Sequence, residues 1–134
     1  MNNLNRIVLG TAQFQNGYGI TKKEIINPHK VLNIAHKLKI KFLDTSPLYG
    51  KSENKIGKIN FKFNIISKIP RIKNHKIDAQ KWVIKNTKQT LKDLKQKKIY
   101  AMLLHHPNDL KGEQGDNLLK GLKNLKEKKL VKKI

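Results

Sequence analysis

The sequence predicts an α/β fold built on a parallel sheet, and three observations lead to that class. Apolar runs of strand length alternate with amphipathic segments of helical spacing, and this strand-then-helix order occurs four times. The strand-length runs are apolar throughout instead of alternating, which is typical of parallel strands buried on both faces. Ionisable side chains stand where three of these runs end, as they do at the carboxyl edge of a parallel sheet.

Four apolar runs are predicted as strands, at residues 6–14, 40–44, 63–68 and 99–107. The first passes into a loop with a glycine-rich turn at residues 16–19, and the last is stopped by Pro107. Residues 130–134 resemble the approach to a fifth strand. The order therefore predicts four βα units with a fifth strand beginning.

The intervening segments carry start signals and apolar stripes of helices. Asn27 is a capping residue before Pro28, and Asp78 can cap a long third helix. Ser52 with Glu53 indicates the start of a short second helix that runs to residue 59. The expected apolar stripes are Val31, Ile34, Ala35 and Leu38 in the first helix, Val83, Thr87, Leu91 and Leu94 in the third, and Leu118, Leu122 and Leu125 in the last.

The placement of polar residues favours a barrel over a doubly wound sheet. No Gly-x-Gly-x-x-Gly follows the first strand, whereas Asp44, Lys68 and His105 each end a different strand. Counting by two, each of them shares a side with an apolar residue of its own strand, so all three extend inward-facing rows. Since a (β/α)8 barrel usually needs about 250 residues, the 134 residues predict a partial TIM (β/α)8 barrel of about the first four βα units.

Composition excludes several classes of protein and site. There is no cysteine, so disulfides and thiolate metal sites are absent. No apolar run approaches the ~20 residues that span a membrane, and the first residues lack a signal-peptide hydrophobic region. We expect a soluble cytoplasmic protein with no membrane partner. The adjacent His105 and His106 lack a third ligand at recognisable spacing, so no metal site is expected.

The formal net charge of +21 suggests a polyanionic partner at first sight. Of the 30 basic residues, however, only Arg6 and Arg71 are arginine, and the 28 lysines are spread along nearly every predicted helix. Bidentate recognition of bases and phosphates favours arginine. We therefore interpret the lysines as generic solvated surface and expect no specific nucleic-acid partner.

One stretch carries a recognisable motif, Asp-Thr-Ser at residues 44–46 followed by Tyr-Gly-x-Ser-Glu at 49–53 and Ile-Gly at 56–57. It resembles the signature of the aldo-keto reductases. The resemblance extends to Leu-Gly-Thr-Ala-Gln-Phe in the first strand, Ile-Ile-Ser-Lys in the third and Leu-Leu-His-x-Pro in the fourth, and it covers essentially the whole chain in the family's order. It implies that residues 1–134 form the amino-terminal half of such a barrel, truncated at strand five.

The resemblance implies an oxidoreductase that reduces an aldehyde or ketone by hydride transfer, with Asp44, Tyr49, Lys68 and His105 as its catalytic set. The hydride comes from a nicotinamide, usually NADPH with NADH as the alternative, and the resemblance implies that Gly10, Thr11, Ala12 and again Asp44 lie beside it. Tyr49 would be the general acid, because the reduced oxygen needs a proton as the hydride arrives. A tyrosine with a pKa near 10 needs a positive neighbour, for which Lys68 is placed, with Asp44 holding the lysine charged. His105 would orient the carbonyl oxygen.

Each of these residues also has an ordinary structural interpretation. Asp44 could cap the following turn, Tyr49 could be a loop aromatic, and Lys68 is one of many lysines; their joint occurrence at strand and loop ends favours the catalytic interpretation. The family's second half carries most nucleotide contacts, so we expect the 134-residue chain to be inactive alone. Gln15 replaces the glycine that many members carry in the first loop. The alternatives are a non-catalytic half-barrel interaction protein and, less favoured, a basic nucleic-acid-binding protein.

Overall fold

A computed structural model of the protein describes residues 6–15, 26–74 and 76–134. Five parallel strands form one sheet in the order β1 (Val8–Gly10), β2 (Phe42–Asp44), β3 (Asn64–Ile69), β4 (Ile99–Leu104) and β5 (Val131–Lys133). Each strand lies beside its neighbour in sequence, which is the connectivity of a (β/α)8 barrel and differs from the reversing order of a doubly wound sheet. The fold class predicted from the sequence is confirmed. The glycine-rich turn at residues 16–19 lies outside the described residues.

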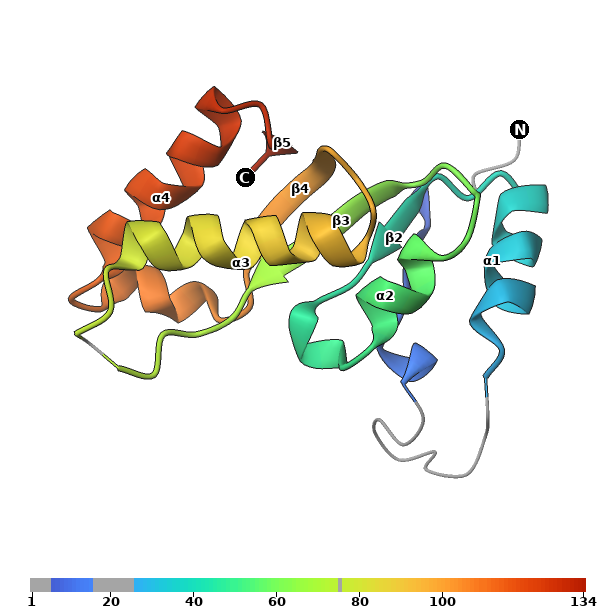
Figure 1. Ribbon diagram of the computed structural model, residues 1–134, viewed down its shortest axis with the longest axis horizontal. Coiled ribbons are helices and arrows are strands. Elements are labelled where there is room, and N and C mark those ends of the chain that lie inside the picture. Colours follow the sequence, from blue (N-terminus) through green and yellow to red (C-terminus); the bar gives the residue numbers. More distant parts are fainter. Residues whose placement is uncertain (1–5, 16–25, 75) are drawn as a thin grey trace.

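Four helices connect these strands. They are α1 (Pro28–Lys37), α2 (Ser52–Gly57), α3 (Ala79–Asp93) and α4 (Gly115–Glu127), with short 3-10 turns at η2 (Ala12–Phe14), η3 (Pro47–Tyr49) and η4 (Pro107–Lys111). Figure 1 shows α2 and α3 lying across the strands, with α1 and α4 at the two ends of the layer. The side chains of Asn27 and Asp78 accept hydrogen bonds from the backbone of Lys30 and Lys81, so both predicted caps are confirmed.

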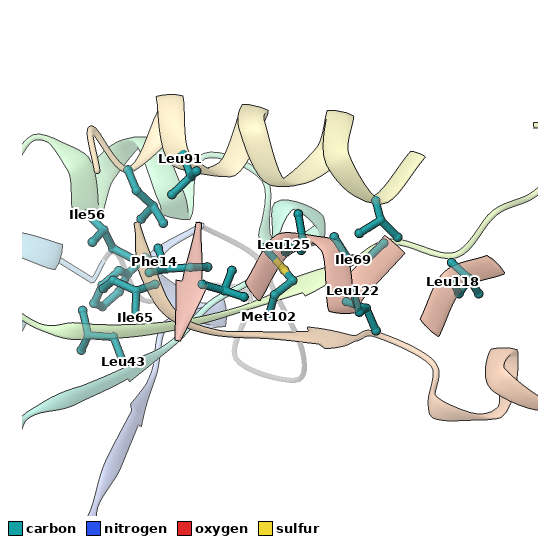
Figure 2. Close-up of a cluster of buried hydrophobic side chains, with 14 of the residues drawn as sticks. Phe14, Leu43, Ile56, Ile65, Ile69, Leu91, Met102, Leu118, Leu122 and Leu125 are labelled. Carbon is teal, nitrogen blue, oxygen red and sulfur yellow. The ribbon is translucent and has the colours of Figure 1, made fainter. Parts of the chain in front are cut away.

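The core lies between the helices and one face of the sheet, as the labelled side chains in Figure 2 show. The stripes predicted for the third and last helices are buried there and pack against Ile65, Ile69 and Met102 of the strands. Burying a side chain of this size stabilises the fold by about 1.5–3 kcal/mol each. The periodicity of apolar residues in the sequence was sufficient to identify the side chains that these two helices contribute to the core.

The opposite face of the sheet, here called the inner face, is open. Along β3, Ile65, Ser67 and Ile69 are buried, whereas Ile66 and Lys68 are only half-buried and Asn64 is exposed. Val8 and Leu103, which lie in register with Phe42 and Lys68, are 45% and 41% exposed. Strands of a complete barrel are buried on both faces, whereas here no described element covers the inner face, as expected for a partial barrel.

Two local predictions also need correction. Ile34 and Leu38 of α1 are 48% and 49% exposed, while Leu32 and Ala35 are buried. The helix stands at the edge of the layer and packs on one flank, so half of its apolar residues lie on the uncovered flank. The second helix begins at Ser52 as predicted, but it ends at Gly57 instead of residue 59.

Candidate active site

The carboxyl ends of the strands bring three of the predicted site residues together. Parallel pairing places Gly10 beside Asp44, and Asp44 beside Ile66, two residues before Lys68. Lys68 Nζ lies 2.7 Å from each carboxylate oxygen of Asp44 and 3.3 Å from Tyr49 Oη. The same ammonium also donates to the carbonyl of Thr45 at 3.1 Å. Asp44, Tyr49 and Lys68 thus form one contiguous hydrogen-bonded group.

The loop after β2 positions Tyr49. Pro47 opens η3, and Ser46 Oγ caps this turn by accepting from the backbone N–H of Leu48 at 3.2 Å. Gly50 follows with φ of 58°, a backbone conformation that side-chain-bearing residues rarely adopt. The turn therefore carries the Tyr49 hydroxyl back to the end of β3.

Gln15 supports the same loop from the first strand's side. Its Oε1 accepts from the backbone N–H of Lys51 at 2.8 Å, and the Lys55 ammonium donates to the carbonyl of Phe14 at 2.6 Å. The sequence departure at this position supplies a link between the loop after β1 and the loop that carries Tyr49. Sequence reasoning noted Gln15 only as a missing glycine.

The charges in this group are partly shielded from water. The side chains of Lys68 and Asp44 are 16% and 31% exposed, so their attraction is stronger than that of a surface ion pair. Lys68 Nζ also lies 5.1 Å from the centre of the Tyr49 ring. The ammonium therefore lies beside the phenolic hydroxyl, and the Asp44 carboxylate balances its charge.

His105 completes the predicted set at the end of β4. Its backbone N–H donates to the carbonyl of Ile69 at 3.0 Å, which extends the β3–β4 pairing by one residue. The imidazole packs edge-on against Tyr49 with ring centres 6.2 Å apart, and its Nδ1 lies 3.2 Å from Ser46 Oγ. Burial lowers the pKa of His105 below its ordinary value; nearby His106 and Lys68 lower it further, and Asp44 opposes them. The ring is thus biased toward its neutral form.

The residues expected beside a cofactor differ in their exposure and in their hydrogen bonds. Thr11 is buried, and both its backbone N–H and its hydroxyl donate to the carbonyl of Asp44. Its side chain therefore joins the ends of β1 and β2. Gly10 is exposed, and a Cβ added there would meet no heavy atom within 4 Å. Ala12 begins η2 and is half-buried.

Glu53 supports the site from behind and was not predicted from the sequence as a functional residue. Its carboxylate is buried and accepts from the Ser67 hydroxyl at 2.6 Å, one residue before Lys68. Burial raises the pKa of Glu53, whereas hydrogen bonds from Ser67 and Thr90 act in the opposite direction. The contact ties α2, which follows the Tyr49 loop, to β3 and α3. Its sequence signal was only a carboxylate in the first turn of a helix.

A cleft of about 810 Å³ lies at the opposite ends of the strands. Among the residues that line it are seven lysines, Lys58, Lys62, Lys95, Lys98, Lys126, Lys129 and Lys132, and its lining within the described chain includes neither acidic residues nor the four predicted catalytic residues. All seven lysines are exposed. We take the Asp44 group as the candidate site because it joins a carboxylate, an ammonium and a phenol by hydrogen bonds. The cleft offers volume and exposed lysines but, in its described lining, no such group.

No group of three potential metal ligands occurs within the described ranges. In the same ranges, no helix combines the length and the apolar character that crossing a membrane requires. The fold and the site together describe a partial parallel α/β barrel with a tyrosine, a lysine and a carboxylate at the carboxyl ends of its strands.

The sequence model of the Aldo/keto reductase family matches residues 6–134. The chain therefore belongs to the aldo-keto reductases, a family that generally uses nicotinamide cofactors to interconvert carbonyls and alcohols. A search among curated proteins found no match to the chain.

Solved structures with the same fold include PA4992 of Pseudomonas aeruginosa, assigned as an aldo-keto reductase, with a TM-score of 0.74 and 23% identity. The match covers 93% of this chain and 52% of that one. The thermostable aldo-keto reductase Tm1743, solved with the inhibitor epalrestat, gives a TM-score of 0.70 at 21% identity, with 92% of this chain and 46% of that chain covered. The chain thus spans about half the length of these structures, and likeness at this identity shows the fold.

Proposed function

We propose that this chain supplies the acid–base half of a nicotinamide-dependent carbonyl reductase. The observation that carries the proposal is the position of Lys68 Nζ, which contacts both oxygens of Asp44 and the hydroxyl of Tyr49. Two side chains, one from β2 and one from the following loop, converge on the ammonium that β3 supplies. This arrangement suits a tyrosine that must release and regain a proton.

The proposed roles follow from the charge that the reaction creates. Reduction adds a hydride to the carbonyl carbon and a proton to its oxygen, giving an alcohol. Tyr49 gives the proton, and Lys68 stabilises the phenolate that remains. Asp44 pairs with the Lys68 ammonium and holds it beside the Tyr49 hydroxyl. His105 donates a hydrogen bond to the same oxygen and fixes its direction.

The exposed end of β1 fits a flat ligand on the inner face. Gly10 offers its backbone without a side chain in the way, and Ala12 adds only a methyl group. Gly10 and Ala12 would lie against NADPH or NADH, which would supply the hydride that no side chain can provide. Thr11 acts indirectly. Its hydroxyl and its backbone N–H both donate to the carbonyl of Asp44, and these bonds fix the end of β1 relative to β2.

Tyr49→Phe tests the acid role, with Tyr100→Phe as the matched control. Tyr100 contacts Phe42 and the Lys132 ammonium and lines the cleft at the other ends of the strands. In a complete barrel that includes this half, NADPH oxidation with a small aromatic aldehyde should fall about 10²–10⁴-fold in Tyr49→Phe and stay near wild type in the control. Equal rates in the two variants would reject Tyr49 as the acid.

The open inner face favours a second candidate function, a non-catalytic interaction module. Val8 and Leu103 expose apolar surface there, which is the composition of a contact surface. Wild-type chain that binds NADPH without turning over aldehyde, and that elutes as an assembly on size-exclusion chromatography, would favour this candidate. A monodisperse monomer would count against it.

A further inference from the structure

Ser46 stands between the loop that carries Tyr49 and the imidazole of His105. It is fully buried, and its Oγ lies 3.2 Å from His105 Nδ1. The two residues are separated by 59 positions in the sequence, so the contact joins the end of β2 to the end of β4. Ser46 is the third residue of the Asp-Thr-Ser motif, and the proposed reduction gives it no role.

The hydrogen bonds of Ser46 limit the direction of this contact. A hydroxyl has one proton to donate and two acceptor positions. One acceptor position receives the backbone N–H of Leu48 at 3.2 Å. For the hydroxyl proton, the described part of the chain offers one partner, Nδ1 of His105. If Nδ1 instead carried a proton and donated to Oγ, the buried serine proton would be left without an acceptor, which is costly.

We propose that Ser46 is a positioning residue that holds neutral His105 in the tautomer protonated at Nε2. The serine hydroxyl donates to Nδ1, so the second ring nitrogen keeps the proton. The groups that face this ring are His106, Lys68, Asp44 and Tyr49. Burial and the neighbouring positive charges favour the neutral ring, which is the form that has a choice of tautomer.

The chosen tautomer matters for the proposed reduction, and this part of the inference rests on that proposed function. A protonated Nε2 donates a hydrogen bond to a carbonyl oxygen and stabilises the charge that develops on it. In the other tautomer Nε2 presents a lone pair, which repels that oxygen. Ser46 therefore selects the tautomer with which His105 can donate at Nε2, without touching the substrate itself.

Nitrogen-15 NMR of histidine-labelled chain tests the tautomer directly. At about pH 8 most histidines are neutral, and long-range proton–nitrogen correlations show which ring nitrogen carries the proton. The signals of His105 are assigned by their loss in His105→Asn. We expect wild-type His105 to be mainly protonated at Nε2, and Ser46→Ala to shift the tautomer ratio about fivefold toward Nδ1. Ser46→Thr, which keeps the hydroxyl, should restore the wild-type ratio.

Ser52→Ala is the matched control, because it removes another buried hydroxyl, one that donates to the carbonyl of Thr11. It should leave the His105 ratio unchanged. Protonation of wild-type His105 mainly at Nδ1 would overturn the proposal, as would a wild-type ratio in folded Ser46→Ala. If Ser46→Ala does not fold, the wild-type spectrum still decides. The experiment uses neither cofactor nor substrate, so absence of reductase turnover and failure of the tautomer assignment are separate results.

Discussion

The two ends of the sheet hold lysines in opposite settings. At the carboxyl end, Lys68 is half-buried and contacts Asp44, Thr45 and Tyr49. At the other end, the seven lysines of the cleft are exposed, and within the described residues none of them forms an ion pair. A lysine gains chemical significance from its partners and its burial, and the high lysine content by itself indicates no function.

Replacing lysine with methionine at each end should give the largest contrast. Lys68→Met leaves the partly buried Asp44 carboxylate without its cation and Tyr49 without its positive neighbour, so we expect a loss of about 1–3 kcal/mol in the free energy of unfolding. In a complete barrel that includes this half, aldehyde turnover should fall about 10²-fold or more. Lys98→Met, in the cleft, should change stability by less than about 0.5 kcal/mol. Urea denaturation measures both, and similar losses would remove the distinction between the two settings.

Replacing a glycine with alanine should also have different effects at the two ends of the sheet. A Cβ on Gly57 would overlap the carbonyl oxygen of Asp93 and lie 2.8 Å from the carbonyl carbon of Leu94, both backbone atoms of the adjoining segment. Gly57→Ala should therefore cost about 1–3 kcal/mol. Gly10→Ala, which meets no atom within 4 Å, should cost much less and instead weaken NADPH binding. Thermal melts and NADPH titrations separate these outcomes; a stable Gly57→Ala would show that the two helices can move apart.

Glu53→Gln gives the smallest effect, and it depends on pH. Because burial raises the pKa of Glu53 in the folded state, its protonated form stabilises the fold at low pH, and this contribution is lost as pH rises through the folded-state pKa. Glutamine stays neutral and still offers an oxygen to Ser67. The variant should match wild type near pH 4 and become relatively more stable toward about pH 8. A constant difference in urea midpoint across this range would contradict the assignment.

Local sequence patterns predicted most of the helices and strands, because interactions between residues close in the sequence determine these elements. The caps at Asn27 and Asp78 and the stripe through α3 depend on neighbours within a few residues. The exposure of Ile34 could not be predicted in this way, because it depends on which elements flank α1.

The candidate site likewise has a part that the sequence predicted and a part that it did not. The motif predicted that Asp44, Lys68 and His105 would meet at the carboxyl edge, and the structure places them there. The contact of Ser46 with His105 and that of Glu53 with Ser67 depend on rotamers and burial across the sheet. Pattern and spacing carry no signal for such contacts. The catalytic and cofactor roles themselves stay predictions.

The long sequence separations within the site have a consequence for the order in which the chain folds. Thr11 bonds to Asp44 across 33 positions, Asp44 to Lys68 across 24, and Ser46 to His105 across 59. Helices such as α3 need only local contacts and form early, whereas contacts between distant segments form slowly. We therefore expect the full set of contacts, which joins the ends of the first four strands, to be complete only after those strands have docked and later than a helix such as α3.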